Sequence, residues 1–113
     1  YKYEPHVDLD RLQEISEAVD AFLVLHGGSG APKLPEAIQL GVVKININAD
    51  IQRAFRDSVH ASLDEHPLDT LYASDILEPA RHAMKNAAKA KIRLFGSNNR
   101  SRAILSRMVL STV

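Results

Sequence analysis

The chain has 113 residues, 45% of them hydrophobic and 25% charged, with a formal net charge of zero. This composition is typical of one soluble globular unit, and it excludes a disordered, collagen-like or disulfide-rich chain. Cysteine is absent, so histidines and carboxylates remain as the strong metal ligands. No apolar run approaches the roughly 20 residues that cross a bilayer, and the first residues do not resemble a cleavable signal. We therefore expect a soluble cytoplasmic protein with no membrane partner.

The chain opens with a predicted helix followed by a predicted strand. Apolar residues recur at helical spacing after Asp8, which suits an N-cap, so we expect a helix over residues 9–20. Residues 21–26 (AFLVLH) form a continuous apolar run, which favours a strand buried on both faces. The segment GGSGAPK that follows has the composition of a loop.

A second helix and strand come next. Residues 35–40 predict a short helix, with Pro35 in its first turn and Gly41 just past its end. Residues 42–47 (VVKINI) are rich in β-branched side chains and predict a strand.

Two longer helices complete the predicted order. An apolar stripe over residues 51–63 predicts a helix with Asn48 as its N-cap. A polar stretch over residues 64–74 separates it from a last helix. That helix opens with a capping-box pattern at residues 75–78, tolerates Pro79 as a first-turn residue, and runs to about residues 89–91. The alternation predicts parallel strands covered by helices, and two strands are too few for a complete domain of that class.

The charges are unevenly distributed along the chain. Residues 1–78 hold all 14 acids and six bases, whereas residues 79–113 hold eight bases and no acid. The bases are Arg81, Lys85, Lys89, Lys91, Arg93, Arg100, Arg102 and Arg107. Such a cluster attracts phosphate, nucleic acid or an acidic partner, or it is simply a solvated helix end and tail. A non-enzymatic basic module that binds a partner or nucleic acid is thus one alternative function, although Phe95 is its single aromatic residue and it has no nucleic-acid motif.

The segment Leu23-Val-Leu-His-Gly-Gly-Ser-Gly30 is the strongest local signal for chemistry. It is a buried strand that ends in His26 and turns through a glycine loop. In parallel barrels the active site lies at the carboxyl ends of the strands, where a histidine ligates metal and glycine N–H groups approach phosphate. A hydrogen-bonded structural histidine and an ordinary glycine turn are the alternative interpretation.

Asn46 and Asn48 stand two residues apart at the end of the second predicted strand, so they point the same way in an extended chain. Amide side chains both donate and accept hydrogen bonds, which suits the hydroxyls and carbonyl of a polyol. In the alternative interpretation Asn48 only caps the next helix and Asn46 bonds backbone.

Three motifs occur in order along the chain: VLHGGSG, KININADIQRAF and LEPARHAMKNAAKAKIRLFGS. In residues and spacing they resemble the C-terminal third of class II fructose-bisphosphate and tagatose-bisphosphate aldolases. The resemblance covers residues 1–97, while the basic tail 98–113 has no counterpart and no assigned role. It implies an α/β fold, namely the last two strands and flanking helices of a (β/α)8 TIM barrel, and a homo-oligomer. The missing strands would leave Phe22, Val24, Val43 and Ile45 exposed.

The same resemblance implies a set of site residues. His26 corresponds to a zinc ligand, the other zinc ligands lying outside this chain. Asn46 corresponds to the catalytic asparagine that binds the dihydroxyacetone-phosphate portion of the substrate near its enediolate. The implied phosphate-binding positions are Gly27, Gly28, Ser29, Asn48 and Ala49, with Gly27 also near a monovalent cation in some members.

The implied activity is reversible aldol cleavage of a ketose (bis)phosphate to dihydroxyacetone phosphate and an aldehyde, with zinc as Lewis acid. The acid and base carboxylates and two zinc histidines are absent from this chain, so we expect the segment alone to be inactive. Ala49 replaces a threonine common in the family. Before the last helix, many members of the family have Asp-Pro-Arg, and the arginine reaches the distal phosphate of the sugar. This chain has Tyr72-Ala-Ser74 at that place. The resemblance therefore leaves open whether the substrate carries one phosphate or two.

The HGGSG loop also resembles the HGGG oxyanion loop of α/β-hydrolase esterases, with Ser29 as the nucleophile. That fold needs a separate nucleophile elbow, and this chain has one glycine loop for both roles, so the esterase alternative is disfavoured.

Overall fold

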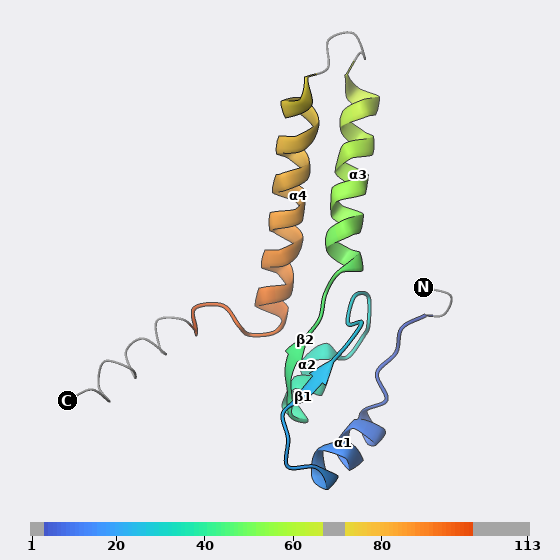
Figure 1. Cartoon of the computed structure of the whole chain (residues 1–113), viewed down its shortest axis with the longest axis vertical. Helices are drawn as coiled ribbons and strands as arrows, with labels where there is room; N and C mark the ends of the chain where they lie inside the picture. The colour runs from blue at the N-terminus through green and yellow to red at the C-terminus, as the bar shows by residue number, and fades with distance from the viewer. Residues whose placement is uncertain (1–3, 67–71, 101–113) are drawn as a thin grey trace, which may run out of the picture.

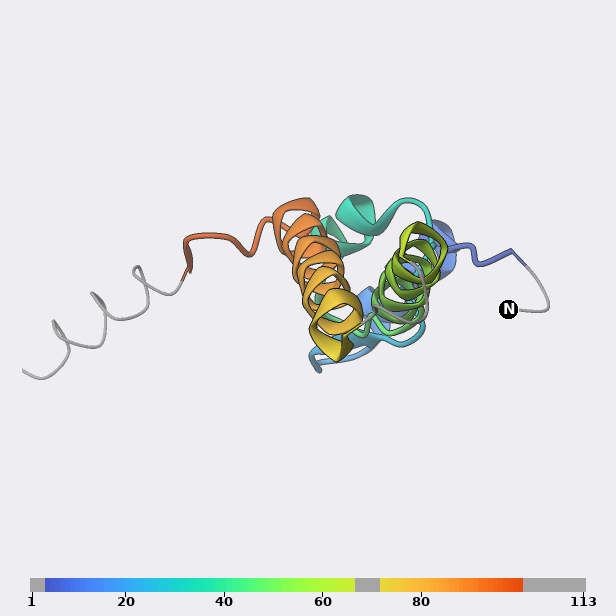
Figure 2. The same ribbon diagram turned by 90° about the horizontal axis from the view of Figure 1, so that it is seen from above.

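The computed structural model describes residues 4–66 and 72–100. In chain order they form α1 (Leu9–Ala18), β1 (Leu23–Leu25), α2 (Leu34–Gln39), β2 (Val42–Ile45), α3 (Ala49–Glu65) and α4 (Ala73–Leu94). The two long helices, α3 and α4, lie side by side and antiparallel: α3 leads away from the short sheet and α4 returns toward it (Figures 1 and 2). The elements thus occur in the order that the sequence predicts.

The two strands pair in parallel, as the helix–strand alternation predicts, and α2 lies on the connection between them. Leu25 pairs with Ile45, and the register is irregular between Leu23 and Val24. Both strands are shorter than predicted, yet their hydrogen bonding continues past the strand ends. The Asn46 N–H donates to the Leu25 carbonyl at 3.0 Å, and the Gly28 N–H donates to the Asn46 carbonyl at 3.0 Å. The loop after β1 is therefore held against the residues after β2.

The prediction that β1 is buried on both faces is wrong. Val24 is 53% exposed and Phe22, just before the strand, is 87% exposed. The described residues build a sheet of two strands, and no further strand covers its edges. Exposure was expected for four apolar residues if neighbouring strands were missing. It is confirmed for Phe22, Val24 and Val43, whereas Ile45 is half-buried because it packs against Gly28.

The buried apolar core of the described residues is small. It consists of Leu34 and Ala37 on α2, Val42 on β2 and Ala80 on α4. The radius of gyration is 19.1 Å, against roughly 13 Å for a compact domain of this length. Two parallel strands with flanking helices and little core agree with a piece of a larger α/β domain, and the described residues do not form a closed barrel. None of their helices is long and apolar enough to cross a membrane.

Two of the predicted helix ends are confirmed by their local hydrogen bonds and backbone angles. The Asp8 carboxylate caps α1 by accepting the Arg11 N–H at 2.9 Å. Gly41 follows α2 with a φ of +103°, a left-handed conformation that glycine adopts without strain. Helix α1 ends at Ala18, two residues earlier than expected.

The predicted start of α4 needs correction. The helix begins at Ala73, and the Asp75 carboxylate reaches back to accept the Tyr72 N–H at 3.0 Å, so Asp75 is the third helical residue rather than the cap. Pro79 consequently lies beyond the first turn, and the reason given for its tolerance is wrong. The helix continues to Leu94, past the predicted end. Of the predicted polar stretch, residues 67–71 lie outside the described residues, and so do residues 101–113 of the tail.

Candidate functional site

A surface pocket of about 490 Å³ opens where β1 and β2 end, and its lining comes from both strand ends: His26, Gly27, Ile45, Asn46, Ile47 and Asn48. His26 and Asn48 are exposed and Asn46 is half-buried. The pocket therefore brings one imidazole and two carboxamides to the carboxyl ends of two parallel strands, where ligands bind in this class of fold.

The glycine loop after β1 needs its glycines for two different reasons. Gly27 and Gly30 have φ values of +75° and +73°, a region that favours glycine. Gly28 instead lies so close to β2 that a Cβ atom there would stand 2.4 Å from Ile45 Cγ2. This close approach lets the Gly28 N–H reach the Asn46 carbonyl, and it keeps the loop against the pocket.

Ser29 connects the glycine loop to the start of α3. Its side chain is almost fully buried, at 3% exposure. Its Oγ accepts two backbone hydrogen bonds, from the N–H of Asn48 at 3.1 Å and from the N–H of Asp50 at 3.3 Å. A hydroxyl has two acceptor positions and one proton. Because backbone donors fill both acceptor positions, the Ser29 hydroxyl has only its proton left to offer to a ligand.

Asp50, in the first turn of α3, makes a second hydrogen bond between the helix and the glycine loop. Its Oδ2 accepts the Gly30 N–H at 3.3 Å and lies 2.6 Å from the Lys91 Nζ on α4. The hydrogen bond from Lys91 lowers the pKa of the Asp50 carboxyl against the opposing effect of burial, and the Gly30 N–H and the charge of Arg53 act in the same direction as Lys91. Asp50 is therefore an ionised link between three segments of the chain.

The structure brings together part of the set of residues predicted from the sequence. His26, Gly27, Asn46 and Asn48 line one pocket, as their places after the two strands predict. Gly28 and Ser29 are buried beside that pocket and do not line it. Ala49 lines a different pocket of about 400 Å³, along the surface of α3.

Asn48 does not cap α3 with its side chain, which corrects the prediction made from the sequence. It occupies the N-cap position without a side-chain cap bond, and its Oδ1 lies 3.5 Å from Gln52 Nε2. The Ser29 hydroxyl, from a loop 19 residues earlier, satisfies helix-start N–H groups instead. Both contacts of this hydroxyl are to backbone N–H groups, neither of which is a general base, and this argues against the esterase alternative.

The sequence predicts one zinc ligand in this chain, His26. Among the described residues no group of three histidines, cysteines or carboxylates is placed to hold a metal. An imidazole nitrogen suits zinc, but a catalytic zinc usually has three protein ligands. The donor set in residues 4–66 and 72–100 therefore fits one ligand of such a site and not the whole site.

Sequence reasoning gave Asp50 no role, and it named Lys91 only as a member of the basic cluster. An acidic residue in the first turn of a helix is a recognisable signal because it favours the positive end of the helix dipole. Its pairing with Lys91, which is 41 positions later in the chain, has no sequence signature. A larger pocket of about 720 Å³, lined mainly by apolar residues of α2, β2 and the segment after α4, was also not predicted.

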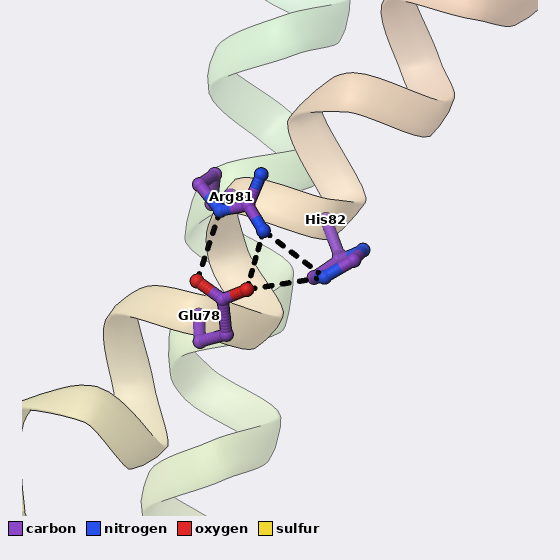
Figure 3. Close-up of polar contacts among 3 residues, drawn as sticks. All are labelled: Glu78, Arg81 and His82. Atoms are coloured by element: carbon purple, nitrogen blue, oxygen red, sulfur yellow. Dashed lines mark hydrogen bonds and ion pairs between the residues drawn. The ribbon is translucent and has the colours of Figure 1, made fainter.

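The basic cluster is partly neutralised in the structure. Arg81 donates to Glu78 through Nε at 2.9 Å and also through Nη2, and His82 Nε2 lies 3.2 Å from the same carboxylate (Figure 3). The hydrogen bond from Arg81 lowers the pKa of Glu78 to about 2. Lys91 is paired with Asp50, and Arg102 and Arg107 lie outside the described residues. These contacts favour a helix surface over a dedicated nucleic-acid interface.

Comparison with known proteins gives one consistent result. Residues 1–100 match the family model described as fructose-bisphosphate aldolase class-II. The chain is 38% identical over 104 residues to sulfofructosephosphate aldolase of Alkalicoccus urumqiensis and to fructose-bisphosphate aldolase of Staphylococcus epidermidis. It is 36% identical over 104 residues to fructose-bisphosphate aldolase of Staphylococcus aureus. Each match covers 90% of this chain and 36% of the relative, so the chain spans about a third of these relatives.

Proposed function

The chain belongs to the class II fructose-bisphosphate aldolase family, and from that premise we propose that it supplies the ketose- and phosphate-binding wall of an aldolase active site. The reaction is the reversible cleavage of a ketose (bis)phosphate to dihydroxyacetone phosphate and an aldehyde. The rest of the site belongs to the part of the fold that this segment does not contain. In this proposal residues 1–97 form the last two strands and flanking helices of a TIM barrel.

One observation carries the proposal: His26, Asn46 and Asn48 line one pocket at the carboxyl ends of two parallel strands. The imidazole suits a metal, while the two amides suit the hydroxyls and carbonyl oxygen of a sugar chain. Local packing does not require a polar side chain at His26 or Asn48, because both residues are exposed.

We assign His26 as one zinc ligand and Asn46 as the catalytic residue that binds the dihydroxyacetone-phosphate portion. When bound, zinc supplies Lewis-acid polarisation of the ketose carbonyl. The Asn46 backbone is fixed on both sides, since its N–H and carbonyl bond Leu25 and Gly28. Its side chain therefore meets substrate from a rigid position, which reduces the conformational cost of binding.

The phosphate is assigned to the loop between β1 and α2 together with the start of α3. Ser29 is assigned to the phosphate site through the loop that it holds: it is buried beside the pocket, and its Oγ ties the loop to the start of α3 by accepting the N–H groups of Asn48 and Asp50. Gly27 lies at the pocket wall, and we assign it also to a monovalent cation. The Gly28 N–H is already bonded to Asn46, so Gly28 contributes close packing rather than a donor. Asn48 and the Ala49 N–H complete the site at the positive end of α3.

The group at the far end of the ketose is a separate question. The named relatives include both a fructose-bisphosphate aldolase and a sulfofructosephosphate aldolase. Tyr72, Ala73 and Ser74 are exposed at the start of α4, and none carries the positive charge that binds a distal phosphate. We therefore propose a ketose phosphate as substrate class and leave the distal group to the rest of the barrel.

The remaining proposals concern the whole protein. Among the described residues no group of three metal-ligating side chains is placed to hold zinc, so we propose that the 113-residue segment alone is inactive. A homo-oligomer and a cytoplasmic location are predicted for the complete protein. The proposed barrel segment ends at residue 97, and no role is assigned to the basic tail 98–113.

The proposal is tested by titrating the ¹⁵N-labelled chain with dihydroxyacetone phosphate and following backbone amide shifts. We expect saturable shifts confined to residues 26–30 and 46–50. Dihydroxyacetone without the phosphate is the matched control ligand and is expected to bind more weakly. In the Ser29→Ala variant the shifts should require higher ligand concentrations, because the loop loses its two hydrogen bonds to the start of α3.

Two outcomes would contradict the proposal. The first is the absence of shifts at the glycine loop at millimolar ligand. The second is a response to the phosphate ester that centres on the basic residues of α4 rather than on the loop, which would favour the non-enzymatic basic module. Cleavage of fructose bisphosphate by the isolated chain with added zinc would separately refute the statement that the segment is inactive.

A further inference from the structure

Three segments that are distant in sequence meet at a single carboxylate oxygen. Asp50 Oδ2, in the first turn of α3, accepts the Gly30 N–H at 3.3 Å and lies 2.6 Å from Lys91 Nζ, near the end of α4. The side chains of both charged residues are largely shielded from solvent, with exposures of 15% for Asp50 and 24% for Lys91. The other ion pairs between charged side chains in the described residues have both partners more than half exposed.

The Asp50 contact and the Ser29 contact form a closed exchange between loop and helix. Ser29 Oγ accepts the Asp50 N–H, and Asp50 Oδ2 accepts the Gly30 N–H in return. As in a capping box, each side chain accepts a backbone N–H from the other segment, but here the two segments are about 20 residues apart in the chain. It fixes the loop only while the Asp50 side chain keeps one rotamer, and the ion pair with Lys91 favours that rotamer.

We infer that Asp50 and Lys91 are positioning residues for the glycine loop: their ion pair holds the Asp50 carboxylate against Gly30 and so keeps residues 27–30 in the conformation that receives phosphate. The inference rests on the proposed function, since it treats this loop as a phosphate site. Lys91 acts through Asp50. It does not line the His26 pocket, and it belongs to the basic cluster that the sequence left without a role.

Alternative roles for the pair make different predictions. If Lys91 only helped α4 to pack on α3, a methionine of similar length would preserve most of its effect, because the aliphatic stem is retained. If Lys91 only attracted phosphate by its charge, its removal would weaken phosphate binding and leave the free loop unchanged. The positioning role requires that the Gly30 amide change in the absence of any ligand.

The test uses the 113-residue chain and follows hydrogen exchange of the Gly30 amide by NMR without ligand. Lys91→Met is expected to speed this exchange about fivefold, as the loss of one typical hydrogen bond would, and Lys91→Arg should restore protection because it keeps the charge. The matched control is Arg81→Met, which breaks the exposed pair with Glu78 on the same helix and should leave Gly30 unchanged. In an Asp50→Ala background, Lys91→Met should have no further effect. Should Asp50→Ala prevent folding, the comparison of Lys91→Met with Lys91→Arg decides alone.

Equal Gly30 exchange in Lys91→Met and in the unaltered chain would overturn the inference. A parallel titration with inorganic phosphate separates this failure from failure of the proposed function. The unaltered chain should show saturable shifts at residues 27–30, with several-fold weaker binding in Lys91→Met. If the unaltered chain shows no phosphate response, the phosphate site is refuted, whereas the exchange data still decide whether the ion pair fixes the loop.

Discussion

Replacing Ser29 by alanine probes how the glycine loop and α3 depend on each other. The substitution removes an oxygen that accepts the N–H groups of Asn48 and Asp50 at 3.1 and 3.3 Å. The loss of a helix N-cap costs about 0.5–2 kcal/mol, and an unpaired, partly buried donor adds to this cost. We therefore expect the free energy of unfolding to fall by about 1–2 kcal/mol.

Urea unfolding followed by far-ultraviolet circular dichroism measures this effect. With a slope of about 2 kcal/mol per molar urea, in the middle of the range for small proteins, the midpoint should fall by about 0.5–1 M at unchanged slope. Ser74→Ala is the matched control, because Ser74 is exposed in the first turn of α4 and its Oγ contacts Asp75 at 3.4 Å. Its effect should stay within about 0.5 kcal/mol. Equal midpoints for the two variants would refute the capping role of Ser29.

Further predictions concern the packing of the loop, the surface charges and the pocket. Gly28→Ala should lower the free energy of unfolding by about 1–3 kcal/mol, since a Cβ there would meet Ile45 Cγ2 at 2.4 Å. If this clash is the cause, adding Ile45→Ala should recover part of the loss in the urea midpoint. Because the folded pKa of Glu78 is about 2, against 4.5 for the free group, its pairing with Arg81 stabilises the fold above about pH 4.5 and is lost as the pH falls toward 2. Carboxyl ¹³C titration should give that low pKa in the unaltered chain and a higher one in Arg81→Met, where the contact with His82 remains, and identical values in both would contradict the assignment. His26→Ala should change the urea midpoint little, because His26 is exposed, so a large loss of stability would show that this histidine is structural.

The sequence predicted the order and type of the secondary structure elements because their signals are local. Apolar spacing placed α1 and α3, and the β-branched run at residues 42–47 placed β2. The burial of β1 was predicted wrongly, since a continuous apolar run reports the environment of a complete domain, whereas Val24 is 53% exposed in the described residues. The cap of α4 was placed three residues too late, at Asp75 instead of Tyr72, because Asp75 suits both the cap and the third helical position.

The candidate site was predictable only in part. His26, Asn46 and Asn48 follow predicted parallel strands, and the carboxyl ends of such strands meet at one edge, so their convergence in one pocket follows from the pattern. The capping role of Ser29 and the Asp50–Lys91 pair depend on contacts between residues 19–41 positions apart. No local preference encodes such contacts, and they become visible only when α3, α4 and the glycine loop are placed together.

The central claim, that this chain supplies one wall of an aldolase site, is tested most directly by a chimera. Residues 4–97 would replace the aligned segment of the Staphylococcus epidermidis fructose-bisphosphate aldolase, to which the chain is 38% identical. The measurement is the rate of fructose bisphosphate cleavage by the purified, folded chimera with zinc. We predict measurable cleavage, and a loss of more than about 100-fold in the His26→Ala and Asn46→Ala chimeras, as expected for a ligand or a transition-state contact. A folded chimera without activity, or one whose activity survives both substitutions, would contradict the account.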